Sequence, residues 1–203
     1  MLKCEPGGRP RSAGDTSMDD VRSIAEAKLR EQADIARRHF KNGPTGPKRS
    51  EHDDRRTAFH EAGHAVCALM NGEVVRAVHI VGHDGEQGEC WVVRLTDFHY
   101  LDLARSLAGL MAESWGVGDF SDDGELASDK DGAGRAFEAI ADEQGWQKDD
   151  ANFQAIIDAA EARLKPYRPQ VERLAEELLK RRMMTGEEVK TLLGEFTTKE
   201  LET

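Results

Sequence analysis

The sequence feature that most constrains the fold is a small polar group inside an otherwise apolar segment, residues 57–70. His60 and His64 lie four residues apart, and Glu61 directly follows the first histidine, in the pattern His-Glu-Ala-Gly-His. Because an α-helix has about 3.6 residues per turn, positions i and i+4 share one face, so the two imidazoles would project side by side. The segment therefore predicts a largely buried helix whose three polar side chains need a partner.

Two imidazoles at this spacing can each direct a nitrogen at one zinc ion, and a glutamate beside the first ligand can reach a water on that ion. Zinc lowers the pKa of such a water to ~7, and the carboxylate can take the proton as the water attacks a carbonyl. Two other histidines, His79 and His83, fall in a predicted strand and turn, where surface or half-buried imidazoles without a metal role are expected. The motif thus predicts His60 and His64 as zinc ligands and Glu61 as the general base of a hydrolase.

Composition argues against several other functions. With 203 residues, a net charge of −11 and 33% charged residues, the chain suits one polar domain with extensions. The acidic balance argues against binding to nucleic acid or to an anionic membrane, and no apolar run approaches the ~18 residues of a transmembrane helix. The first 17 residues lack the apolar core of a secretory signal, and three cysteines at unrelated spacings favour a reducing cytoplasm over disulfides. No glycine-rich phosphate loop is present, so any ATP-driven step is expected to come from another protein.

Glycine and proline divide the chain into segments. Residues 1–17 are rich in Gly, Pro, Arg and Ser and are predicted to be disordered, with Met18 as an alternative start of translation. Residues 18–49 are predicted to form a weakly amphipathic helix followed by a Gly/Pro linker. Residues 50–195 are predicted to form the catalytic domain, and residues 196–203 a frayed tail.

The pattern of the domain predicts a mainly α fold with a small β-hairpin, that is, an α+β class. Its first helix is expected from the N-cap Ser50 to residue 70, where Asn-Gly ends it. Two β-rich runs, 74–81 and 89–95, predict the hairpin. Further helices are expected at 98–115, from the cap Ser128 to 144, at 150–164, at 169–182, and at 186–193 behind a Thr185/Glu188 capping box.

Two histidines do not complete a zinc site, because a catalytic site takes a third protein ligand and keeps an open position for water. Cys67 lies on the same helix, but a cysteine there is more often part of the core. Glu113 lies on a downstream helix and could either complete the site or orient a ligand histidine. Asp129 and Asp131 fall near the start of a predicted helix, and spacing alone does not separate them.

Several segments together resemble the protease domain of the FtsH-type ATP-dependent metalloproteases. Phe-His-Glu-Ala-Gly-His-Ala-Val at 59–66 is similar to the family's zinc helix. Gly-Leu-Met-Ala-Glu at 109–113 resembles its Gly-Arg-Ala-Ala-Glu helix, and residues 126–133 resemble the segment that supplies its aspartate ligand. Residues 174–178 and 185–189 resemble its C-terminal helices. The matches come in the family's order and cover roughly residues 55–195.

The resemblance implies a helical zincin fold, a Zn²⁺ cofactor, and Asp129 as the third ligand with Asp131 in reserve. Membrane helices and an ATPase module precede the protease in FtsH itself, and neither is expected in this chain. The family's Pro-Arg-Gly after the first strand is replaced here by Gly-His-Asp at 82–84, and its Gly-Arg by Gly109-Leu110. These differences leave open how the hairpin binds a substrate, but they do not change the expected metal ligands.

The expected function is therefore that of a stand-alone, ATP-independent zinc metalloendopeptidase of the His-Glu-x-x-His type, acting in the cytoplasm on unfolded or small peptides. An extended peptide would add to an exposed strand of the hairpin. Three alternatives stay open: a protease subunit served by a separate ATPase, a non-catalytic zinc-stabilised interaction module, and a zinc hydrolase of non-peptide amides. Neither nucleic acid nor a membrane is expected as a partner, and the sequence does not predict an oligomeric state.

Overall fold

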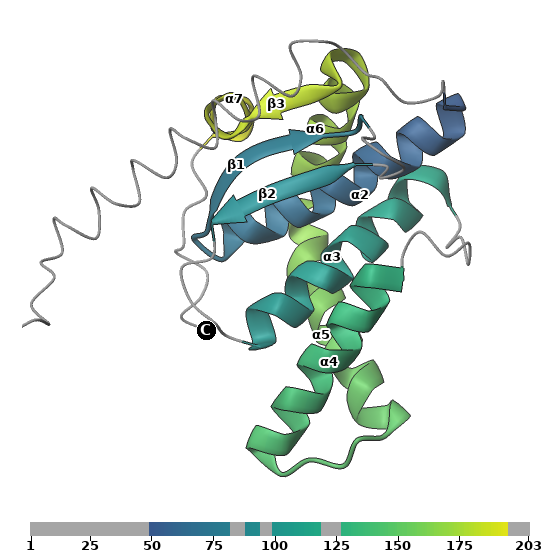
Figure 1. The fold of residues 1–203 in the computed structure, drawn as a ribbon, viewed down its shortest axis with the longest axis vertical. Helices are drawn as coiled ribbons and strands as arrows, with labels where there is room; N and C mark the ends of the chain where they lie inside the picture. Colours follow the sequence, from purple (N-terminus) through teal and green to yellow (C-terminus); the bar gives the residue numbers. More distant parts are fainter. Residues whose placement is uncertain (1–48, 82–87, 94–98, 119–126, 195–203) are drawn as a thin grey trace, which may run out of the picture.

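The computed structural model describes residues 49–81, 88–93, 99–118 and 127–194. Helices dominate these ranges and a small antiparallel sheet completes them (Figure 1), which confirms the predicted mainly α fold with a small β component. The predictions for residues 1–48, for the tail 196–203 and for His83 lie outside the described residues. The elements are α2 (Glu51–Met70), β1 (Val74–His79), β2 (Glu89–Val93), α3 (His99–Val117), α4 (Ala127–Gln144), α5 (Asp150–Leu164), the 3-10 turn η1 (Lys165–Tyr167), α6 (Arg168–Arg181), β3 (Met183–Thr185) and α7 (Gly186–Leu193).

Helix α2 begins and ends where the sequence predicts. The Ser50 hydroxyl accepts a hydrogen bond from the Asp53 backbone N–H at 3.1 Å, and acidic residues in the first turn complement the helix dipole. At the other end, Asn71 caps the helix and Gly72 adopts φ +73°, a left-handed conformation that costs glycine little.

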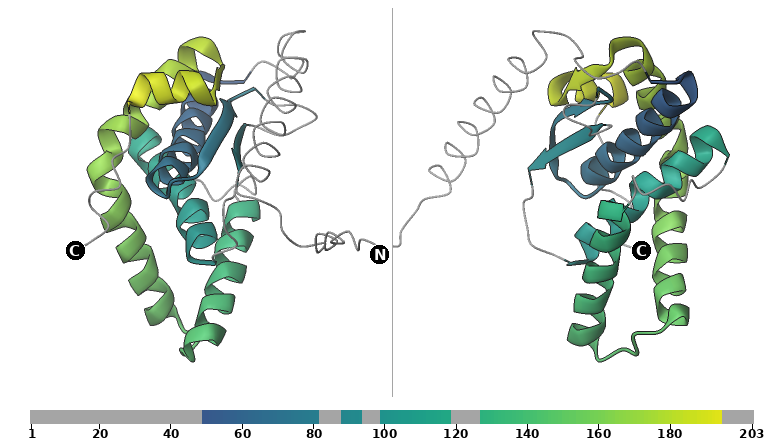
Figure 2. Two further views of the ribbon diagram at one scale, coloured as in Figure 1. Left: turned by 90° about the vertical axis from the view of Figure 1, so that its left-hand side faces the viewer. Right: turned by 45° about the vertical axis from the view of Figure 1, so that its right-hand side comes forward.

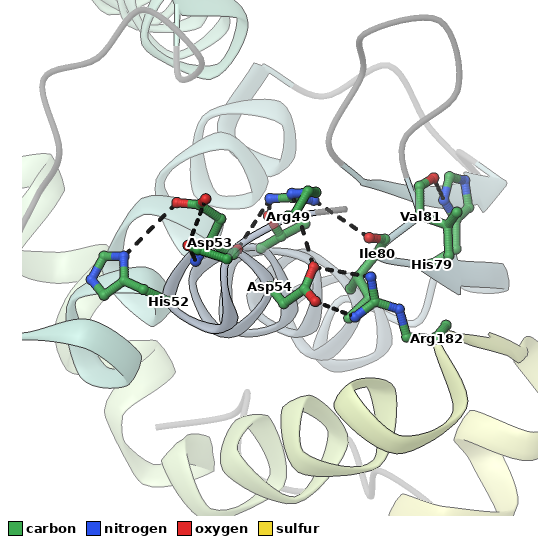
Figure 3. Close-up of polar contacts among 10 residues, drawn as sticks. Arg49, His52, Asp53, Asp54, His79, Ile80, Val81 and Arg182 are labelled. Atoms are coloured by element: carbon green, nitrogen blue, oxygen red, sulfur yellow. Dashed lines mark hydrogen bonds and ion pairs between the residues drawn. The ribbon is translucent and has the colours of Figure 1, made fainter. Parts of the chain in front are cut away.

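An amino-terminal ion cluster, made of Arg49, Asp54 and Arg182, ties the start of α2 to its neighbours (Figure 3). Arg182 donates two hydrogen bonds to the Asp54 carboxylate, at 2.5 and 2.9 Å. Arg49 donates to the Ile80 carbonyl at 3.4 Å and to the Asp53 carbonyl at 3.1 Å. Since Arg182 follows α6 and Ile80 follows β1, the cluster joins three elements at one end of the domain.

Helix α2 lies at the centre of the domain, with the sheet on one side and α3 and α6 packed along the others (Figures 1 and 2). Helices α2 and α3 approach closely because Gly63 has no side chain: a Cβ there would overlap the Ala108 carbonyl. This approach brings α3 against the face of α2 that carries the predicted site. The deepest core side chains include Phe59, Val66, Leu103, Leu174, Leu178 and Met184.

The sheet has the strand order β2-β1-β3, with β1 antiparallel to both neighbours. Strand β3 was not predicted: it has three residues, too few for an alternating pattern, and pairs Ala77 with Thr185. The predicted hairpin is therefore two strands of a three-stranded sheet, with β2 at one end of the order.

Helices α4 and α5 extend from the body as two arms, which Figures 1 and 2 show below α3. The rings of Phe137 and Phe153 meet between the arms with centroids 5.0 Å apart. Helix α4 already includes Ala127, so Ser128 lies inside its first turn rather than at the predicted cap. Among the described helices, none is both long and apolar enough to cross a membrane.

Candidate metal centre

Three side chains from two helices converge on one point, and we call this group the metal centre. His60 and His64 come from the middle of α2, and Asp129 comes from the first turn of α4. Asp129 Oδ2 lies 2.8 Å from His60 Nε2 and 3.2 Å from His64 Nε2. The two Nε2 atoms lie 3.0 Å apart. Within the part of the chain that the structure describes, this is the one group of three His, Cys, Asp or Glu side chains able to hold a metal ion.

The outer contacts of the two imidazoles decide which nitrogen faces the centre. His64 Nδ1 lies 2.9 Å from the Arg105 carbonyl, and a carbonyl only accepts, so Nδ1 carries the proton and donates. In the neutral ring the lone pair is then on Nε2, which faces the metal centre. His60 Nδ1 faces Glu113 Oε2 at 3.3 Å, an ion-pair contact rather than a well-aligned hydrogen bond. Both rings therefore direct Nε2 inward.

The donor set fits zinc. Two imidazole nitrogens and one carboxylate oxygen are common zinc ligands, and tetrahedral bonds of about 2.0–2.2 Å place neighbouring ligand atoms roughly 3.3–3.5 Å apart. The three ligand atoms already lie within 3.2 Å of one another. A metal ion would relieve the mutual repulsion of lone pairs held this close.

The close contacts in the metal centre shift the pKa values of His60 and Asp129. Burial alone would lower the pKa of His60, but the hydrogen bond to Asp129 and the ion-pair contact with Glu113 outweigh it and raise this pKa to about 10. Burial would raise the pKa of Asp129, but the His60 and His64 imidazoles beside its carboxylate outweigh it and hold this pKa well below its ordinary value. These opposite shifts favour a proton on His60 beside an ionised Asp129 carboxylate.

Glu61 lies beside the centre rather than in it. Its side chain is buried, and this burial raises the pKa of its carboxyl group. Gly88, directly before β2, lies against it: a Cβ at this glycine would come within 3.0 Å of Glu61 Oε1. The backbone at the start of β2 therefore passes close to the carboxylate that the sequence predicts as the general base.

Glu113 lies behind His60 and is almost fully buried, with 1% of its surface exposed. Arg56 Nε lies 3.7 Å from Glu113 Oε1, so the carboxylate stands between a guanidinium and an imidazole. Glu113 thus contacts the outer nitrogen of His60 and is not part of the three-residue centre.

The other residues considered from sequence lie elsewhere. Asp131 is exposed, two residues further along α4 than Asp129. Cys67 is buried, which raises the pKa of its thiol to about 11, and its sulfur accepts a hydrogen bond from the Asn71 amide. His79 is more buried than expected, at 6% exposure, and its Nδ1 donates to the Val81 carbonyl at 3.1 Å. None of the three belongs to the metal centre.

Two contributions were not anticipated from sequence. Gly109 of α3 lies against both imidazoles: a Cβ there would come within 2.6 Å of His64 Nε2 and 2.9 Å of His60 Cε1. The Arg105 carbonyl, one turn earlier on α3, fixes the proton on His64. A glycine four residues before Glu113 is a signal that could have indicated the first, whereas a backbone acceptor leaves no mark in the sequence.

Comparisons with known proteins indicate a distant relative among zinc metalloproteases. The chain matches no protein-family model. It is 32% identical over 183 residues to the ATP-dependent zinc metalloprotease FtsH 1 of Symbiobacterium thermophilum, in an alignment that takes in 74% of this chain and 31% of that protein. The chain thus spans about a third of the length of the curated relative it matches. These values indicate a distant relationship to the FtsH-type metalloproteases.

Proposed function

We propose that this chain is a zinc metallopeptidase in which His60, His64 and Asp129 hold the metal and Glu61 is the general base. The single observation that supports it best is the convergence of two Nε2 atoms and one carboxylate oxygen within 3.2 Å beside a buried glutamate. The distant relationship to a zinc metalloprotease favours peptides as substrates.

Bound zinc would supply Lewis-acid chemistry toward water and a peptide carbonyl. Glu61 takes a proton from the attacking water and delivers it to the leaving amine. The raised pKa of its buried carboxyl group suits this cycle, because the group can hold the proton between the two transfers. Glu113 keeps the His60 ring oriented through the 3.3 Å contact with Nδ1.

The substrate is an extended polypeptide that adds to β2. This strand ends the sheet order β2-β1-β3, so one of its edges faces away from β1. Main-chain hydrogen bonds to such an edge hold a peptide in extended form with little dependence on its sequence. Because the backbone at Gly88, directly before β2, passes close to Glu61, a peptide on this edge would run past the general base. Unfolded segments and small peptides meet this requirement without ATP.

The test is hydrolysis of an unfolded casein-type substrate by the full chain loaded with zinc, without ATP, beside Glu61→Gln. Wild type is expected to cleave, and the variant to be slower by about 10²–10⁴-fold, the usual contribution of a general base. Metal analysis should find about one zinc per chain in both proteins, because Glu61 is not a ligand.

Two results would contradict the proposal. Equal cleavage by wild type and Glu61→Gln would remove the role of Glu61. No cleavage by either protein, with zinc bound at the same stoichiometry, would contradict an ATP-independent peptidase and favour a zinc-stabilised binding module. Repeating the assay with short peptides and with simple amides separates a narrow substrate range from a non-peptide hydrolase.

A further inference from the structure

A buried ion pair lies at the other end of α2 from the amino-terminal ion cluster. Glu73 follows the turn that ends α2, and its side chain is 1% exposed. Arg105 Nη2 lies 3.3 Å from Glu73 Oε1, and the Arg105 side chain is 12% exposed. The same Nη2 donates to Asp102 Oδ1 at 3.0 Å, one turn back on α3. The pair thus joins the connection between α2 and β1 to the middle of α3.

The residue that carries this guanidinium also supports the metal centre. The carbonyl of Arg105 accepts the hydrogen bond from His64 Nδ1 at 2.9 Å. A carbonyl at this position selects the tautomer with a proton on Nδ1 and turns the Nε2 lone pair toward the metal centre. The position of this one turn of α3 relative to α2 therefore controls the orientation of His64.

Stability alone accounts poorly for the pair. Removing two charges from water costs about as much as their attraction returns, so buried pairs of this kind often contribute little net stability. An apolar residue could replace Arg105, since nearby positions of α3 place Leu103, Leu107 and Met111 in the core. A pair that is neutral for stability can still fix the separation of the two elements it joins.

We infer that the buried Glu73–Arg105 ion pair is a positioning device that holds the Arg105 carbonyl against His64 and so presets this imidazole for metal binding. The inference rests on the proposed function in one respect, the role of His64 as a ligand. Glu73 and Arg105 touch neither metal nor substrate, and they act through His64.

The test replaces the pair by apolar residues of similar length, Glu73→Leu with Arg105→Met, in the full chain. Such exchanges commonly keep the fold stable. We expect Co²⁺ affinity, followed by visible absorption, to fall by about 10–100-fold, as when residues supporting a metal ligand are lost. In the metal-free protein, ¹⁵N chemical shifts of His64 should change from one Nδ1-protonated tautomer to a mixture.

Two further variants separate positioning from general structure. Arg105→Lys keeps a cation opposite Glu73 but loses the planar fork, so its Co²⁺ affinity should fall between those of wild type and the double variant. The matched control is Asp54→Leu with Arg182→Met, which removes the ion pair of the amino-terminal ion cluster on the same helix. It should leave Co²⁺ affinity and the His64 tautomer unchanged.

The outcomes distinguish this inference from the proposed function. Wild-type protein that binds no Co²⁺ overturns the metal centre itself. Wild-type binding, with a double variant that binds as tightly and keeps the Nδ1-protonated tautomer, overturns the positioning role alone. An equal loss of affinity in the Asp54/Arg182 control would assign the effect to stability and also overturn it.

Discussion

Helix α2 carries two polar groups that differ in how their atoms meet. In the amino-terminal ion cluster donors face acceptors: the Arg182 guanidinium forks onto the Asp54 carboxylate, and Arg49 donates to the Ile80 and Asp53 carbonyls. In the metal centre the atoms that converge are two imidazole nitrogens and a carboxylate oxygen, all of which can present lone pairs. The first group is complete with protein atoms alone, whereas the second needs a cation or a proton.

This difference distinguishes a structural polar cluster from a candidate site on the same helix. A buried group that is satisfied by its neighbours favours one conformation and leaves no room for a ligand. Convergent acceptors are costly unless something positive joins them. Substitutions in the two groups should therefore affect different measured quantities, metal affinity in one and the free energy of unfolding in the other.

The largest effect is expected from Asp129→Ala. Loss of a ligand should lower zinc affinity by more than about 100-fold, since losing residues that only support ligands already costs 10–100-fold. Competition with a chromophoric chelator measures this. The matched control is Asp131→Ala, two residues further on the same helix and exposed. If Asp131→Ala lost zinc affinity and Asp129→Ala kept it, Asp131 rather than Asp129 would be the third ligand.

The choice between these aspartates shows what sequence alone can predict. Residues two apart on a helix point about 200° apart, so only one of Asp129 and Asp131 can face α2. Which one does depends on the rotation of α4 about its own axis, a property of tertiary packing. The resemblance to a known family favoured Asp129, and it is Asp129 that the structure places beside the histidines.

Local chemistry explains which secondary-structure predictions were met. The motif helix was predictable from its apolar pattern, its cap Ser50 and the Asn71-Gly72 end, all of which act within a few residues. Strand β3 was missed because pairing with β1, rather than its own pattern, makes it a strand. The burial of His79 follows from the same cause, since β1 becomes a central strand only when β3 joins it.

Gly109→Ala should have the next largest effect on the metal centre. Its Cβ would come within 2.6 Å of His64 Nε2, so the ring must turn away from its present position. We expect zinc affinity to fall by about 10–100-fold although no ligand is removed. Gly134→Ala is the control: it lies on α4 with nothing within 4 Å of its Cβ, and should add up to about 1 kcal/mol of stability. Unchanged affinity in Gly109→Ala would show that α3 does not confine the rings.

Asp54→Asn tests the amino-terminal ion cluster, the other polar group on α2. The amide keeps the shape of the side chain but replaces one acceptor oxygen of the fork to Arg182 with a donor. Because both side chains are only partly buried, we expect a loss of about 1–2 kcal/mol in the free energy of unfolding, measured with urea, and no change in zinc affinity. Glu176→Gln, which weakens the more exposed pair with Arg55, should cost less than about 1 kcal/mol. A change in zinc affinity in Asp54→Asn would mean that the two groups are coupled.

The last expected effect is a pH dependence of the free energy of unfolding, which bound metal should abolish. In metal-free protein the carboxylates of Asp129 and Glu113 overcome the effect of burial and raise the pKa of His60 to about 10. A folded-state pKa above the unfolded value of ~6.5 adds stability that is complete below ~6.5 and lost as the pH rises toward the folded value.

Thermal unfolding in a chelator should therefore show stability falling between about pH 6.5 and about pH 10, and His60→Gln should flatten this slope. Zinc-loaded protein should also lack it, because the ion holds His60 deprotonated. A metal-free protein that becomes more stable over this range would contradict the convergence of His60 with two carboxylates, and with it the contrast between the two groups on α2.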